Sequence, residues 1–84
     1  MQILMDEVEK LLELLYQENE EQSYNQLVAI IPQLEQEIQK MTDAELQQQT
    51  MQGLLLVMQA MEAGDLTLLA DYLKYEVIER ILGA

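Results

Sequence analysis

The chain has 84 residues, half of them hydrophobic, and a formal net charge of −12. That apolar content is too high for an intrinsically disordered protein, despite the charge. The chain has no histidine and no cysteine. This excludes disulfides, histidine- or cysteine-dependent nucleophiles and histidine-containing metal sites. We therefore expect a non-enzymatic protein, with no catalytic residue, metal or cofactor.

The length predicts a single domain over residues 1–84. Its patterning predicts an all-α fold, a compact antiparallel bundle of three to four helices. The scattered cations Lys10, Lys40, Lys74 and Arg80 form no basic patch, which argues against direct binding of nucleic acid or of an anionic membrane surface. The longest uncharged stretch, residues 46–61, is too short and polar to span a bilayer. We expect a cytoplasmic protein.

The first helix is predicted over residues 2 to about 19. Apolar residues recur there at spacings of three and four, as expected for one buried stripe: Leu4, Val8, Leu11, Leu12 and Leu15. Acidic residues crowd the end of this helix, where the helix dipole disfavours negative charge. We expect that end to fray.

Ser23 is the predicted N-cap of the second helix. Its apolar residues follow a seven-residue repeat, with Ile30 beside it: Leu27, Ile31, Leu34, Ile38 and Met41. Pro32 interrupts this repeat, so the helix either bends there or ends at Ile31 and restarts. We favour the bend, because the repeat continues in register across Pro32.

Thr42 and Glu45 predict a capping box at the start of a third helix that runs to about residue 63. This helix is apolar on most sides, which predicts a central position. Gly53 in its interior costs about 1 kcal/mol relative to Ala and indicates a close helix approach.

The fourth helix is predicted to follow Gly64, as the left-handed C′ residue, and Asp65, as the N-cap. Its core face comprises Leu66, Leu69, Ala70, Leu73, Val77 and Ile81. A second apolar stripe lies on roughly the opposite side, and a fully exposed stripe is unusual in a monomer. This stripe is the predicted partner-binding site: Leu68, Tyr72, Tyr75, Ile78 and Leu82.

Negative charge is concentrated near the start of the chain. The first 21 residues contain seven acids and one cation, Lys10, which gives a net charge of −6. Glu76 is the best candidate for a half-buried acid, although an exposed i,i+4 pair with Arg80 is the favoured interpretation.

Residues 27–34 (LVAIIPQL), 61–65 (MEAGD) and 69–76 (LADYLKYE) resemble a group of small acidic all-helical proteins from Gram-positive bacteria. That group has no assigned activity. The overall style is also similar to small acidic export chaperones of flagellar and secretion systems. This likeness implies sequestration of a partner's amphipathic helix and assigns no functional residue.

The sequence thus predicts a protein-interaction module, chaperone- or adaptor-like, that binds a basic or amphipathic helix of a protein partner. The acids of the first helix would steer that partner electrostatically. One alternative is a homodimer closed by the second stripe. Another is an acidic decoy that mimics phosphate charge and binds a nucleic-acid-binding protein.

Overall fold

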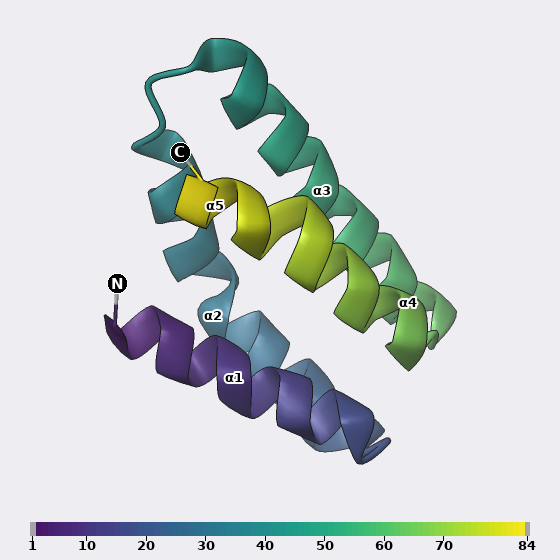
Figure 1. The fold of residues 1–84 in the computed structure, drawn as a ribbon. Coiled ribbons are helices and arrows are strands. Elements are labelled where there is room, and N and C mark those ends of the chain that lie inside the picture. Colours follow the sequence, from purple (N-terminus) through teal and green to yellow (C-terminus); the bar gives the residue numbers. More distant parts are fainter. Residues whose placement is uncertain (1, 84) are drawn as a thin grey trace.

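The computed structural model describes residues 2–83, which form helices and no strand (Figure 1). The first three helices are α1 (Gln2–Tyr16), α2 (Glu20–Gln39) and α3 (Ala44–Ala63). The C-terminal helix has three consecutive segments: α4 (Leu66–Asp71), the π-helical η1 (Tyr72–Ile78) and α5 (Glu79–Gly83). The predicted all-α bundle is confirmed.

The helices pack as two pairs. α1 lies against α2, and α3 lies against the C-terminal helix, while α1–α4 and α2–α3 contacts join the pairs. All the helices contribute to one cluster of buried apolar side chains. The predicted stripe of the first helix is confirmed, with Leu12 only partly buried: Leu4, Val8, Leu11 and Leu15 are in the core.

α1 ends at Tyr16, three residues before the predicted end. Glu18 adopts a left-handed conformation (φ 57°). The Asn19 amide donates to the Leu14 carbonyl, and the Glu18 amide donates to the Leu15 carbonyl, both at 3.0 Å. These bonds form a Schellman motif, with a glutamate at the position that usually holds glycine. The end of the helix is therefore capped by hydrogen bonds.

The predicted N-cap at Ser23 is wrong. α2 begins at Glu20, and the Asn19 side chain accepts a hydrogen bond from the Gln22 amide at 3.3 Å. Asn caps a helix as well as Ser does, and the turn at Glu18 places Asn19 at the helix start. Ser23 instead lies inside α2, fully buried, and its hydroxyl has no hydrogen-bond partner among the described residues.

α2 continues through Pro32 as a single helix, as the seven-residue apolar repeat predicted. In Figure 1 the two halves of α2 run in different directions, in agreement with a bend. Pro32 itself is exposed, so its ring meets solvent rather than the core. Ile31 and Met41 are only partly buried, and the buried stripe is Ser23, Leu27, Ile30, Leu34 and Ile38.

The turns that flank α3 are built by side-chain and backbone caps. Asp43, not Thr42, caps α3, accepting hydrogen bonds from the amides of Glu45 and Leu46 at 3.1 Å. The predicted turn at Gly64 is confirmed, with φ 71°. Asp65 caps α4 as predicted, by accepting a 2.9 Å bond from the Leu68 amide.

The predicted central position of α3, with neighbours on all sides, is wrong. α3 packs on the C-terminal helix and on α2, and Leu55 on its outer side is 52% exposed. The close approach predicted at Gly53 is confirmed, because a Cβ atom at this position would lie 2.9 Å from the Cβ of Glu76 and closer still to the Glu76 carbonyl oxygen. α3 and η1 therefore come into backbone contact.

Candidate interaction surface

The C-terminal helix turns its predicted core face inward. Leu69, Leu73 and Val77 are fully buried. Ala70 and Ile81 are also buried, while Leu66 is half-buried at the start of α4. This face fixes the rotation of the helix in the bundle, and so decides which side chains remain accessible on its other side.

The predicted second stripe is divided between the surface and the core. Leu68 (37%), Tyr75 (51%) and Leu82 (57%) are exposed. Tyr72 is half-buried and packs against the core cluster, whereas Ile78 is only 7% exposed and belongs to that cluster. Ile78 is therefore not an available partner-binding residue. We call Leu68, Tyr75 and Leu82 the outer surface.

The π-helical segment explains the burial of Ile78. On an α-helix each step of four residues advances about 40° around the axis. Wider i→i+5 turns offset that advance, so the buried series Leu69, Leu73, Val77 and Ile81 keeps to one side of the helix. Ile78 lies next to Val77 within the wide turn and is buried with it.

Gly53 and Arg80 attach η1 and α5 to α3. The Arg80 guanidinium donates to the Gln49 carbonyl of α3 at 2.9 Å and to the Glu76 carbonyl at 3.4 Å. It also forms the predicted i,i+4 ion pair with the Glu76 carboxylate, at 2.7 Å, and both side chains are partly buried. Wide i→i+5 turns can leave a backbone carbonyl oxygen without its usual amide donor. The Arg80 guanidinium has several N–H groups that can donate to such an oxygen.

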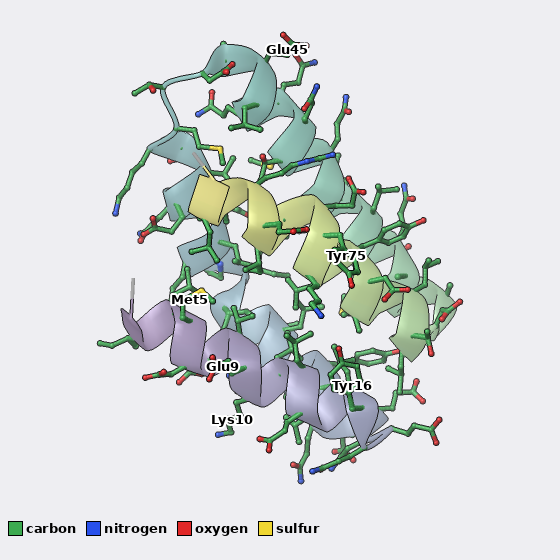
Figure 2. The ribbon with its side chains drawn as sticks, viewed as in Figure 1. Met5, Glu9, Lys10, Tyr16, Glu45 and Tyr75 are labelled. Carbon is green, nitrogen blue, oxygen red and sulfur yellow. The ribbon has the colours of Figure 1, made fainter. Side chains whose placement is uncertain are left out.

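The four tyrosines occupy different environments. Tyr16 (67%) and Tyr75 are exposed, while Tyr24 and Tyr72 pack against the core. Burial, together with the negative charge of Glu20, raises the pKa of the Tyr24 hydroxyl. The Lys74 ammonium lies 5.3 Å from the centre of the Tyr75 ring, a cation–π geometry. Figure 2 labels Tyr16 on α1 and Tyr75 on the C-terminal helix.

An open groove of about 660 Å³ lies at the end of the outer surface, where α5 meets the α2–α3 turn. Leu82 lines it, next to the buried Ile81, so the groove extends the outer surface onto α2 and α3. Its remaining lining residues are Glu37, Lys40, Met41, Thr42, Asp43, Leu46 and Gly83. Lys40 pairs with Glu37 across 3.2 Å at its rim.

A smaller pocket of about 150 Å³ lies at the opposite end of the C-terminal helix, between the end of α1 and α4. Leu15, Leu66 and Ala70 supply apolar lining atoms, together with Thr67. Its other lining residues are Tyr16, Glu18 and Asp71. Helical periodicity does not predict this pocket, and the acidic residues at the end of the first helix are its main signal in the sequence.

Comparison of the chain with protein-family models, curated proteins and solved structures finds no match. Within residues 2–83 no acidic cluster is arranged to hold a metal ion. No helix in that range is long and apolar enough to cross a membrane.

Proposed function

We propose that the protein is a non-enzymatic interaction module, chaperone- or adaptor-like, that binds an amphipathic helix of a basic partner protein. The observation that carries this proposal is the outer surface. Of seven large apolar side chains exposed in residues 2–83, three lie on the C-terminal helix, seven residues apart: Leu68, Tyr75 and Leu82. Apolar side chains left exposed on a helix can be covered by the apolar face of an amphipathic partner helix.

Charge favours a foreign partner over a second copy. Each copy carries a net charge of −12, so two copies repel each other, whereas a cationic helix is attracted. Half of that charge, −6, lies in the first 21 residues, whose acids belong to α1, the following turn and the start of α2. These acids would raise the association rate of a basic partner more than they raise its affinity.

Selection from a displayed library of amphipathic helical peptides tests the proposal. We expect peptides with apolar residues at i, i+3 or i+4 and i+7, flanked by Lys or Arg. The variant Leu68→Ser with Tyr75→Ser should bind these peptides at least about tenfold more weakly. The matched control is Val28→Ser with Leu55→Ser, two exposed apolar residues on other helices, which should bind normally.

Equal binding by both double variants would overturn the assignment of the outer surface. Circular dichroism checks that each variant keeps its helicity. Light scattering after size exclusion, at low and moderate salt, tests the alternatives. A dimer at both salt concentrations that dissociates in the Leu68→Ser, Tyr75→Ser variant would favour the homodimer instead. If the selected peptides share only their positive charge, and their binding weakens steeply with added salt, the acidic-decoy alternative is favoured.

A further inference from the structure

The pocket between α1 and α4 combines an apolar lining, an exposed aromatic ring and two carboxylates. The ring is Tyr16, at the end of α1 (Figure 2), and the carboxylates belong to Glu18 and Asp71. No hydrogen bond or ion pair within residues 2–83 engages either carboxylate. The pocket contains no cationic side chain among its lining residues.

We propose that this pocket receives a lysine or arginine side chain of the partner protein. This inference rests on the proposed function and specifies the partner's chemistry. Lysine and arginine have apolar stems and cationic heads. Leu15, Leu66 and Ala70 suit the stem, and the two carboxylates and the Tyr16 ring suit the head.

Size and position support a single side chain as the occupant. The pocket volume of about 150 Å³ is well below the roughly 300–1,000 Å³ of pockets that enclose small molecules. Asp71 is three residues after Leu68 and four before Tyr75, which are helix-neighbour spacings. A partner helix seated on the outer surface would therefore pass the mouth of this pocket.

The surrounding charge favours a cation. α1 ends at Tyr16, and the C-terminus of a helix carries partial negative charge. Glu20 and Glu21 follow in the first turn of α2. The N-terminus of α4 has the opposite polarity, but the Asp65 carboxylate accepts a hydrogen bond from the Leu68 amide there. The local field is therefore predominantly negative.

The probe for this test is Nα-acetyl-lysine methylamide, titrated into ¹⁵N-labelled protein at low salt. We expect saturable amide shifts centred on residues 15–18 and 66–71. Nα-acetyl-norleucine methylamide, which lacks the charge, should bind at least about tenfold more weakly. Shifts that spread over all acidic segments without saturation would overturn the proposal.

Glu18→Gln with Asp71→Asn should weaken binding of the lysine probe by about tenfold. The matched control, Glu9→Gln with Glu45→Gln, removes the same charge from exposed residues elsewhere on α1 and α3 (Figure 2). An equal loss in both variants would mean that net charge alone attracts the probe, and would overturn the pocket assignment.

The two proposals fail in different ways. If the lysine probe does not bind but Leu68→Ser with Tyr75→Ser still abolishes peptide binding, only the pocket assignment is wrong. If the probe binds saturably but no displayed helix binds the outer surface, the proposed function is wrong, and the pocket recognises cations by itself.

Discussion

Glu18 adopts a left-handed backbone conformation that is unfavourable for an L-residue. It is the only non-glycine residue among the described residues with a positive φ, 57°, which costs about 1–2 kcal/mol in an L-residue. It also places a negative charge beside the C-terminus of α1, where the helix dipole disfavours it. The turn is therefore formed by the flanking hydrogen bonds, despite its central side chain.

Glu18→Gly should raise the free energy of unfolding by about 1 kcal/mol, because glycine adopts this conformation without strain. Urea denaturation measures the change. Glu18→Gln is the control, because it removes the charge and keeps the strain. If the Gln variant is stabilised as much as the Gly variant, charge rather than backbone strain is the cause.

Ser23→Ala should raise the free energy of unfolding by about 1 kcal/mol, since a buried hydroxyl without a partner loses its hydration without compensation. Thr50→Ala is the contrasting variant. Thr50 is also fully buried, but its hydroxyl donates to the Leu46 carbonyl at 2.7 Å. Thr50→Ala should lower the free energy of unfolding, because it removes a buried methyl group as well as this hydrogen bond. Destabilisation by Ser23→Ala would show that its hydroxyl is satisfied.

Gly53→Ala should lower the free energy of unfolding by about 1–3 kcal/mol. The new methyl group would overlap the backbone of Glu76, and this clash outweighs the better helix propensity of alanine. Gly83→Ala is the control, because no atom lies within 4 Å of a Cβ built there. If both variants are equally stable, α3 and η1 separate at little cost.

At the scale of elements, Arg80 attaches the C-terminal helix to α3. Arg80→Met should lower the free energy of unfolding by about 1 kcal/mol, a modest value because the ion pair with Glu76 is partly exposed. Lys40→Met changes the net charge equally, but Lys40 is 72% exposed. It should change stability by less than about 0.5 kcal/mol. Equal changes in stability for the two variants would indicate that net charge, rather than the contacts of Arg80, is the cause.

At the scale of the whole molecule, sixteen acids share a body of 35 × 25 × 18 Å. Screening acts over about 10 Å at 0.1 M salt, so moderate salt should weaken repulsion across this body. We expect the melting temperature to rise with salt, by about 4–8 °C for each 1 kcal/mol gained. Differential scanning calorimetry measures this rise.

The less acidic variant Glu9→Gln with Glu62→Gln, both exposed and neither at a helix N-terminus, should melt higher at low salt and gain less from added salt. A melting temperature of the original chain that stays flat between low and moderate salt would contradict the repulsion argument. Both measurements report on the charge of the whole molecule, because every acidic residue contributes to its electrostatic field.

The helices and several of their ends can be predicted from local sequence patterns. Apolar spacing along α1 and α2 needs only the helical period, and the Gly64–Asp65 turn needs only local backbone and side-chain chemistry. Gly53 indicated that some helix approaches closely there, because a glycine inside an apolar helix costs helix propensity, and the structure identifies the approaching segment as η1. The helical periods and the turn depend on neighbours in the chain, which a sequence displays directly.

The candidate site, in contrast, depends on how the helices pack against each other. The choice of i→i+5 turns in η1 accompanies packing of the Glu76 backbone on Gly53 and of Arg80 on α3, and it buries Ile78 while Tyr75 stays exposed. The pocket at Tyr16 likewise joins the end of α1 to α4. Both depend on how separate helices are placed against each other, and helical periodicity contains no information about that placement.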